Sequence, residues 1–558
     1  MTTTLIPSKA KYANGAVLPE LTIEVRKTLL NIIDVVGQDV KIADESSTLP
    51  RVAAATIRQC LDATKQVALS DDNSDTVCLR KLATASQRVR ALLRRQNDQF
   101  LAVPWKAVPR AWRCCSTDAT IVLVCAEIIL LDTHATTSAA DPSATTQSTT
   151  AFSDSRQISS RILGLIRSLD ECLIVTGAPG DGRSSLIHHL IHLLQSLYQS
   201  IPSPPADPIV STSEQATTEP AAKRARLSYK REQEPQPGPV RATQDVLELA
   251  ELPGLLDFLN NHIDRPFIVR GWADGWPALQ PDEESDEPRS GPRWSCGTYL
   301  TRLVGPGRVV PVEIGRAYTD AEWTQAMIPW EDFLQRAGWI LDPPQQPPPL
   351  RSEDKEQDGP TTYLAQHTLL TQFPELEADM IRPDLVYSCP PAPSWMPEYR
   401  APVNTEGGET EDVVVNAWIG PGGTLSPAHT DPYYNLFVQV VGHKQFWLAP
   451  PEANERGGMY QFSDTDASQA VTEQRQSGLP ASSQVAASYM DNTSQLDVFA
   501  PPQSDGDPSE DAFPLFTKQV EPLALKAVVG PSDLLYIPPM WWHAVRSLSK
   551  SISISHFF

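Results

Sequence analysis

The sequence lacks the cysteine pattern of a metal-binding or disulfide framework. Its eight cysteines include no pair at CxxC spacing, and most lie in apolar stretches of helical periodicity. This absence excludes the usual zinc ribbons and fingers, and it favours reduced thiols in an intracellular protein. We therefore expect neither a structural zinc ion nor a disulfide network.

Long apolar runs are also scarce. The N-terminal residues MTTTLIPSKAKYANGAV contain no apolar core of a signal peptide. The most apolar stretch, residues 119–131, is shorter than the roughly 20 residues that span a bilayer. We expect a soluble protein with no membrane partner.

Basic residues are outnumbered by acidic ones. The chain has 46 Lys and Arg against 68 Asp and Glu, a net charge of −22 at pH 7. This balance argues against electrostatic binding to nucleic acid, so we expect no direct sequence-specific nucleic-acid contact. It favours a basic protein or peptide substrate, such as a histone or another Arg- or Lys-containing protein. An acid excess that only keeps a large protein soluble explains the charge equally well.

Prolines are abundant, and they help to divide the chain. The 51 prolines among 558 residues are nearly twice the usual share of about 5%. Residues 1–200 carry apolar residues at intervals of three and four, which predicts an all-helical N-terminal domain. A stretch rich in Thr, Ser and Ala, at about 134–160, is expected to be a disordered insertion in it.

Residues 201–243 have the composition of a flexible linker, rich in Pro, Ser, Thr, Glu and Ala. The linker contains a basic cluster, Lys223–Arg231, which is either a nuclear-import address or a solvated charge run. We favour import because the cluster stands alone in an acidic chain. The nucleus is therefore the expected location, with the cytoplasm also open.

One segment of the helical domain has the spacing of a phosphate-binding loop. Residues 177–184 fit GxxxxGK[ST], except that Arg183 occupies the lysine position. Arginine is bulkier and planar, and no strand–helix series follows to supply an acidic residue for Mg²⁺. We expect the turn of a helical hairpin instead. His188, His189 and His192 then read as a polar helix face and not as a metal site.

From residue 244 to residue 558 the pattern changes to short strands punctuated by Gly and Pro, which is typical of a sandwich or small barrel. Polar, Pro-rich stretches at about 342–360 and 453–513 are expected to be insertions. The expected strands are residues 413–419, 435–441, 444–448, 534–537, 544–548 and 551–558. The predicted fold class is therefore α+β and multidomain, with a helical N-terminal domain before a β barrel that has flanking helices.

The residues that carry chemistry lie in this second part. His429 and Asp431 are two positions apart, so a strand would direct both side chains to one face. His543 completes a two-His-one-carboxylate set, which leaves open positions on Fe(II), although an isolated HxD is common by chance. Lys444 heads a later strand. If its ammonium is buried it needs an anion such as a dicarboxylate; a surface position is the usual alternative for lysine.

Four motifs occur together here: PAHTDPYYN, VQVVGHKQFWLAPP, VVGPSDLLYIPPMWWHAVRSL and SISISHFF. Together they resemble the JmjC class of Fe(II)- and 2-oxoglutarate-dependent oxygenases. The resemblance runs from about Asp245 to Phe558 outside the insertions. It implies that the barrel is a double-stranded β-helix, or cupin, with O2 and 2-oxoglutarate as cosubstrates.

The resemblance also assigns residues to the cofactors. The implied iron ligands are His429, Asp431 and His543. Lys444 would pair with the distal carboxylate of 2-oxoglutarate, with Tyr363 hydrogen-bonding nearby. Asn435 would contact the end of the cosubstrate that chelates the metal.

Three further residues match positions that line the substrate pocket in this class: Glu313, Trp418 and Ser426. A carboxylate and an aromatic ring suit a guanidinium. An internal ion pair for Glu313 and barrel packing for Trp418 remain open. The chain departs from the class at His556 and Phe557, where related proteins usually carry further aromatics, and in the length of the second insertion.

The resemblance implies oxidation of a protein side chain. Many histone demethylases of the class carry Glu where this chain has Asp431, whereas the HxD form with Lys444 is usual among protein hydroxylases. We therefore favour hydroxylation, of arginine. Demethylation of N-methyl-lysine in histones is the alternative within the class. A non-catalytic binding scaffold for chromatin or regulatory proteins is a second alternative, which the intact triad and lysine disfavour.

Overall fold

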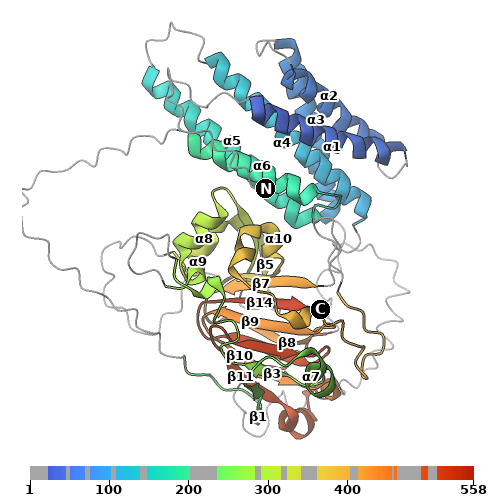
Figure 1. The fold of residues 1–558 in the computed structure, drawn as a ribbon, viewed down its shortest axis with the longest axis vertical. Coiled ribbons are helices and arrows are strands. Elements are labelled where there is room, and N and C mark those ends of the chain that lie inside the picture. Colours follow the sequence, from blue (N-terminus) through green and yellow to red (C-terminus); the bar gives the residue numbers. More distant parts are fainter. Residues whose placement is uncertain are drawn as a thin grey trace, which may run out of the picture. The chain divides into compact units, whose positions relative to one another are not determined.

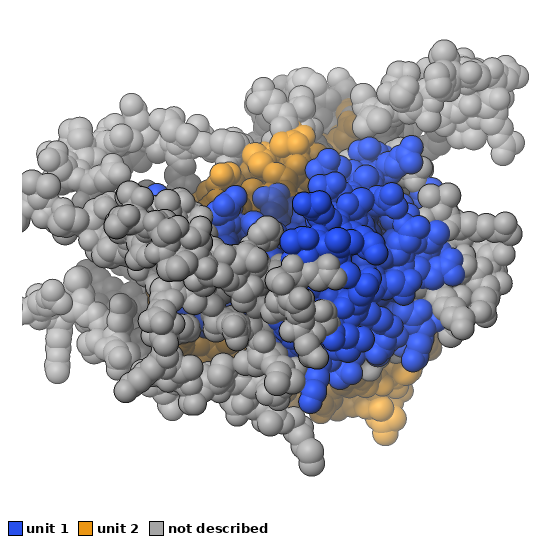
Figure 2. All heavy atoms as spheres, turned by 90° about the horizontal axis from the view of Figure 1, so that it is seen from above, with its two compact units in different colours: residues 1–225, 305–309, 405–410 blue, residues 226–304, 310–404, 411–558 orange. Residues whose placement is uncertain are grey.

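The protein divides into two compact units, which are coloured separately in Figure 2. The first unit comprises residues 1–225, 305–309 and 405–410, and the second comprises residues 226–304, 310–404 and 411–558. The computed structural model describes residues 23–45, 51–69, 76–101, 108–138, 147–201, 235–282, 291–315, 323–340, 361–402, 413–454, 458–460, 492–500 and 512–558.

The described part of the first unit is a helical bundle (Figure 1). Its helices are α1 (Ile23–Glu45), α2 (Arg51–Ala68), α3 (Thr76–Leu101), α4 (Arg110–Ser138), α5 (Gln147–Thr176) and α6 (Arg183–Ser200). Their apolar faces meet in one core that includes Ile33, Ile57, Val122 and Ile166. The prediction of a helical N-terminal region is confirmed.

Helix α4 contains an apolar stretch that is longer than residues 119–131. Arg110–Leu131, 22 residues, is long and apolar enough by length and composition to cross a membrane. However, 94% of its most apolar window is buried inside the protein, which is also expected of a central bundle helix. The stretch exceeds residues 119–131 because small side chains such as Cys114 and Cys115 continue the apolar run.

Helix also covers most of residues 134–160, where an insertion was expected. α4 continues to Ser138 and α5 begins at Gln147, and residues 139–146 lie outside the described part. Thr and Ser cost only about 0.5 kcal/mol each in a helix. Packing of the apolar residues that follow, such as Ile162, outweighs this cost.

The loop-like motif at residues 177–184 forms the turn between α5 and α6. Arg183 is only 2% exposed, and its Nε donates a hydrogen bond to Asp118 Oδ1 at 2.7 Å. Gly180 and Gly182 have positive φ values of 123° and 68°, which glycine adopts without strain. The guanidinium is therefore engaged in an internal ion pair, as expected for a helical hairpin.

The second unit is built on two β-sheets. The five-stranded sheet has the order β1-β11-β10-β13-β8, and the nine-stranded sheet the order β2-β3-β12-β9-β14-β7-β6-β4-β5. The strands are β1 (Gln244–Asp245), β2 (Leu247–Leu249), β3 (Phe267–Val269), β4 (Val309–Ile314), β5 (Thr324–Pro329), β6 (Thr362–His367), β7 (Val414–Gly420), β8 (Leu425–Thr430), β9 (Asn435–Val441), β10 (Lys444–Ala449), β11 (Leu525–Val529), β12 (Leu534–Ile537), β13 (Trp542–Ser547) and β14 (Ser551–Phe557).

From β7 onward the chain passes repeatedly from one sheet to the other. Strands β7, β9, β12 and β14 belong to the larger sheet, and β8, β10, β11 and β13 to the smaller one. This alternation is the winding of a double-stranded β-helix, and Figure 1 shows β7, β14 and β9 as neighbours in it. The predicted fold class is confirmed.

Short helices flank the barrel: α7 (Leu255–Asp257), α8 (Gly297–Val304), α9 (Trp330–Arg336) and α10 (Leu369–Gln372). Their buried residues Leu300, Phe333 and Leu369 join the core on the outer face of the larger sheet, together with Ile552 and Ile554 of β14. A separate apolar cluster, including Phe437 and Phe446, fills the space between the sheets. The barrel is therefore packed on both faces of its larger sheet.

Parts of the expected linker and of the second insertion pack on the barrel. Trp447 Nε1 donates to the Arg241 carbonyl at 2.7 Å, and Leu496, Val498 and Phe499 are buried in a cluster on the outer face of the smaller sheet. The basic cluster Lys223–Arg231 and the insertion at 342–360 lie outside the described residues.

Candidate active site

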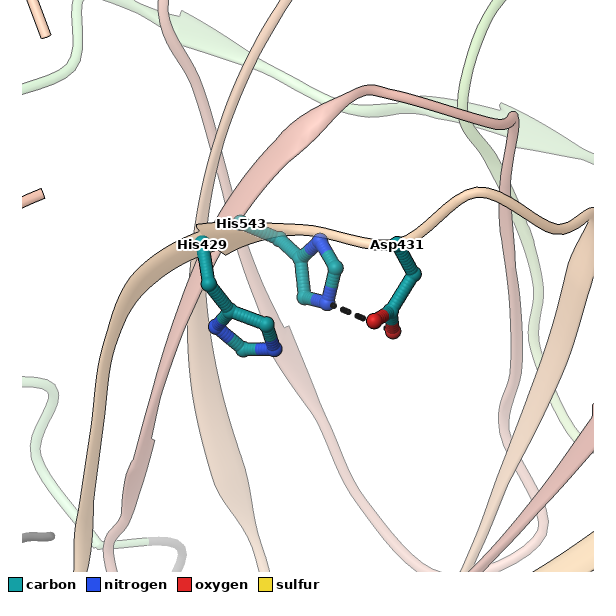
Figure 3. A group of neighbouring side chains, drawn as sticks. All are labelled: His429, Asp431 and His543. Carbon is teal, nitrogen blue, oxygen red and sulfur yellow. Dashed lines mark ion pairs between the residues drawn. The ribbon is translucent and has the colours of Figure 1, made fainter. Parts of the chain in front are cut away.

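The two histidines of the expected triad face each other across neighbouring strands. His429 of β8 and His543 of β13 are register partners in the antiparallel pair, and their ring centroids are 4.2 Å apart. Asp431 follows directly after β8, and its Oδ2 lies 3.6 Å from His543 Nε2 (Figure 3). One ligand atom from each residue lies within 4.8 Å of the other two. In the described chain this is the one cluster of its kind.

Both histidines present Nε2 to the cluster. His429 Nδ1 donates to the Pro427 carbonyl at 2.7 Å, and His543 Nδ1 donates to the Trp541 carbonyl at 3.0 Å. Since a carbonyl only accepts, the hydrogen lies on Nδ1 and the Nε2 lone pair is free to bind a metal. In each case the partner is two residues earlier on the same chain segment. The backbone thus selects the ligating tautomer.

The protonation states also suit a divalent cation. Burial, with a smaller effect from His543, lowers the pKa of His429 to about 4. Burial alone would raise the pKa of Asp431, but its interactions with the neighbouring His543 and His429 lower it overall. A neutral imidazole and an ionised carboxylate are the forms that metals bind.

A buried cation lies in the same pocket. Lys444 is 2% exposed, and its Nζ donates to the Tyr363 hydroxyl at 3.4 Å. Among the described residues Lys444 forms no ion pair, and burial lowers its pKa to about 7. The alternative of a surface lysine is therefore wrong for Lys444.

Tyr363 is held in place by a glycine. A Cβ atom on Gly420 of β7 would collide with the Tyr363 ring on the neighbouring β6. Only glycine lets the ring lie this close to the strand backbone. The tyrosine hydroxyl is thereby brought to Lys444.

The structure gathers most of the expected site residues into one pocket. These are Tyr363, Trp418, Ser426, His429, Asp431, Asn435, Lys444 and His543. Glu313 is not among the lining residues. It is the register partner of Tyr363 one strand away, and burial raises the pKa of its carboxyl. Trp418 donates from Nε1 to Ser555 Oγ at 3.1 Å.

Six lining residues were not expected from the sequence: Phe437, Phe446, Ile537, Val545, Ser555 and Phe557. Phe437 and Phe446 each stand two positions after an expected site residue, so strand alternation could have found them. His556 lies between two lining residues and therefore points to the opposite face of β14. It is fully buried there, which agrees with a structural histidine away from the pocket.

The pocket fits a metal with a dicarboxylate beside it. Asn435 Oδ1 is buried without a hydrogen-bond partner among the described residues, although an amide oxygen deprived of water normally has one. A buried lysine without a carboxylate partner is similarly costly unless an anion binds. Both groups share the pocket with the triad. The residues therefore suit Fe(II) with 2-oxoglutarate.

Comparison with known proteins identifies the family of this chain. A family model described as a cupin-like domain matches residues 258–558, more than half of the chain. The chain belongs to the cupin-like JmjC family. This JmjC protein is 30% identical over 323 residues to lysine-specific demethylase 8 of Xenopus tropicalis, and 33% identical over 334 residues to lysine-specific demethylase 8 of Danio rerio.

These matches cover 57% and 60% of the JmjC protein described here, and 54% and 63% of the two relatives. A third relative is the human bifunctional peptidase and (3S)-lysyl hydroxylase JMJD7. It is 24% identical over 305 residues, which cover 53% of this chain and 77% of the human protein. The similarity to the two demethylases thus extends over less than two thirds of their lengths.

Proposed function

We propose that the protein is an Fe(II)- and 2-oxoglutarate-dependent dioxygenase that oxidises a C–H bond in a basic side chain of a protein. One observation carries the proposal. A cluster of two His Nε2 atoms and one carboxylate shares a pocket with a buried lysine that lacks a carboxylate partner among the described residues. The cluster of two histidines and one carboxylate is a facial ligand set, and the buried lysine is a receptor for a dicarboxylate.

His429, Asp431 and His543 would hold the iron on one face. Lys444 and the Tyr363 hydroxyl would bind the distal carboxylate of 2-oxoglutarate, and Asn435 would contact its chelating end. When bound, Fe(II) with 2-oxoglutarate and O2 supplies an oxidant that inserts oxygen into a C–H bond, with succinate and CO2 as products. Phe437, Phe446 and Ile537 line the pocket, where apolar walls exclude water from the reaction.

Two outcomes of the same C–H oxidation fit the proposal. On an N-methyl carbon, hydroxylation gives a hemiaminal that releases formaldehyde, so the protein loses a methyl group. On a side-chain carbon of arginine, the alcohol is stable. The relatives named lysine-specific demethylases favour N-methyl-lysine demethylation, and we place it first. The HxD ligand pair and the neighbouring Glu313 and Trp418 keep arginine hydroxylation as the second candidate.

Anaerobic reconstitution followed by turnover tests the enzyme. The purified protein is loaded with Fe(II) and given 2-oxoglutarate, ascorbate, O2 and a library of basic peptides with and without N-methyl-lysine. We expect succinate to form in proportion to modified peptide. The peptide mass decides the reaction, since demethylation removes one CH2 and hydroxylation adds one oxygen. No peptide-dependent succinate from iron-loaded protein would contradict catalysis and favour a binding scaffold.

A ligand variant tests the metal site itself. We expect His429→Ala to abolish stoichiometric Fe(II) binding, because two remaining ligands hold a labile cation weakly. Equilibrium dialysis with metal analysis measures the ratio of iron to protein. His262→Ala is the control, since His262 is partly buried in a helical turn outside the pocket. Stoichiometric iron in His429→Ala would contradict the assignment.

The substrate and the location follow the charge distribution. An acidic protein attracts Arg- or Lys-rich segments, so a basic protein such as a histone is the proposed substrate class. The basic cluster at residues 223–231 supports a nuclear location. Deleting that cluster from a fluorescently tagged protein, and observing whether the nuclear signal falls, tests the location.

A further inference from the structure

A segment of the expected insertion pairs with the strand that carries the first metal ligand. Strand β8 ends the five-stranded sheet, with β13 as its neighbour on one side. On its other side lie residues 492–494, where Thr493 forms an antiparallel bridge with His429. Ser494 N–H donates to the Ala428 carbonyl at 2.8 Å. The outer edge of β8 is thus paired just where His429 stands.

Asn492 binds both polar backbone groups of one residue. The Thr430 N–H donates to the Asn492 carbonyl at 3.0 Å, and Asn492 Nδ2 donates to the Thr430 carbonyl at 2.9 Å. Thr430 is the residue between His429 and Asp431. Asn492 therefore fixes the peptide units that join the two ligands, although its own side chain is exposed and lies outside the pocket.

The residues after Asn492 hold this segment against the barrel. Ser494 Oγ donates to the Met459 carbonyl at 2.6 Å and accepts from the Leu496 N–H at 3.1 Å. Leu496 and Val498 are buried in the same cluster as Ala428 of β8 and Trp542 of β13. The segment is therefore anchored to the outer face of both ligand-bearing strands, and Asn492 is presented from a fixed support.

This pairing matters for the metal ligands because β8 is an edge strand of its sheet. Unpaired edge N–H and C=O groups allow a strand to fray, and Asp431 lies one residue beyond the end of β8. On its far side, Asp431 is held by its carbonyl, which accepts from the Met540 N–H at 2.7 Å. Without Asn492, the peptide between Thr430 and Asp431 loses its restraint on the β8 side.

We infer that Asn492 is a positioning residue of the metal centre, acting through Thr430 on the spacing of His429 and Asp431. The inference rests on the proposed function, because it assumes that the triad binds a metal. Partners that orient metal ligands usually contribute about 10- to 100-fold to metal affinity. Since Asn492 acts through one peptide unit, the lower end of that range is the expected effect.

Co(II) alone is a suitable probe, because its absorption spectrum reports ligand geometry and needs neither O2 nor 2-oxoglutarate. Full-length wild type, Asn492→Ala and Asn492→Asp are titrated with Co(II), and the thermal midpoint of each metal-free protein is recorded. Asn261→Ala is the matched control, because it also removes an exposed side-chain amide. That amide donates to Asp257 Oδ1 at 2.7 Å, and neither Asn261 nor Asp257 lines the pocket.

We expect Asn492→Ala to bind Co(II) about tenfold more weakly with an altered absorption spectrum, while its metal-free midpoint matches that of Asn261→Ala. Asn492→Asp separates the effect of positioning from the effect of charge. Its extra negative charge would by itself attract the cation, but a carboxylate cannot donate to the Thr430 carbonyl. Weaker binding in Asn492→Asp would therefore support positioning.

Two results would overturn the inference. One is an unchanged affinity and spectrum in Asn492→Ala; the other is tighter binding than wild type in Asn492→Asp, which would show that only charge matters. Failure of the proposed function has a different signature, since wild-type protein itself would then not bind Co(II) at the triad and His429→Ala would change nothing.

Discussion

Lys444 illustrates how single residues prepare this pocket. Burial removes water from its ammonium and lowers its pKa from 10.5 to about 7. The aromatic rings of Phe437 and Tyr363 lie 5.6 Å and 5.8 Å from Nζ, and they stabilise a cation only modestly. Under the proposed function a carboxylate of 2-oxoglutarate supplies the missing stabilisation, so the protonation of Lys444 and the binding of this cosubstrate would be linked.

The linkage predicts a pH dependence with a definite sign. Since the anion binds the charged lysine, its affinity is highest below pH 7 and falls about tenfold per pH unit above it. Calorimetric titration of Mn(II)-loaded protein with 2-oxoglutarate from pH 6.5 to 8.5 measures this slope. Lys444→Arg stays charged throughout, so its affinity, though altered in size, is expected to be flat. An equally flat wild-type curve would rule out the linkage.

At the scale of elements, the site depends on close approach between strands and on sharp links between sheets. Gly442, with φ of 73°, connects β9 to β10, and a Cβ atom there would collide with the Lys550 carbonyl. This link turns the chain from one sheet to the other just before Lys444. Gly420 on β7 also permits a close approach, because the ring of Tyr363 packs where a Cβ atom would lie.

We expect Gly420→Ala to disturb cosubstrate binding more than metal binding. The added methyl group displaces the Tyr363 ring, and overpacking of this kind typically costs about 1–3 kcal/mol. The KM for 2-oxoglutarate should rise about tenfold, which corresponds to about 1.4 kcal/mol, with Fe(II) stoichiometry unchanged. Gly275→Ala is the control because a Cβ atom there meets nothing within 4 Å. Equal KM values in the two variants would contradict the role of Gly420.

At the scale of the whole molecule, stability depends on polar groups enclosed by the cores. His556 of β14 is fully buried, and its Nδ1 donates to the Leu436 carbonyl at 3.1 Å. Its Nε2 has no hydrogen-bond partner within the part of the chain that the structure describes. Burial lowers its pKa from 6.5 to about 4, with the neighbouring charge of Arg382 acting in the same direction. A proton added to this ring would have to enter an apolar core.

His556 therefore makes the fold sensitive to acid. The unfolded chain takes up the proton near pH 6.5 and the folded chain only near pH 4, so the free energy of unfolding falls as the pH drops between these values. At pH 5 the expected loss relative to pH 7 is about 2 kcal/mol. Urea unfolding of wild type and His556→Phe at both pH values checks this. Between pH 7 and pH 5, the free energy of unfolding of His556→Phe should fall by about 2 kcal/mol less than that of wild type. Equal losses in the two proteins would refute the role of His556.

The sequence by itself determined what is encoded locally. Strand alternation put His429 and Asp431 on one segment, and helical periodicity predicted the bundle, because both patterns repeat within a few residues. The motifs around Lys444 and His543 likewise pointed to one pocket, and the structure brings their residues together.

Tertiary structure decided what depends on distant partners. Only the fold shows that Asn492, within a polar stretch expected to be an insertion, pairs with β8, because strand pairing between remote segments leaves no local periodic signal. Only the fold places Glu313 one strand away from the pocket lining. Helix formation through most of residues 134–160 was likewise decided by packing, since the cost of Thr and Ser in a helix is smaller than the gain from burying the apolar residues beyond them.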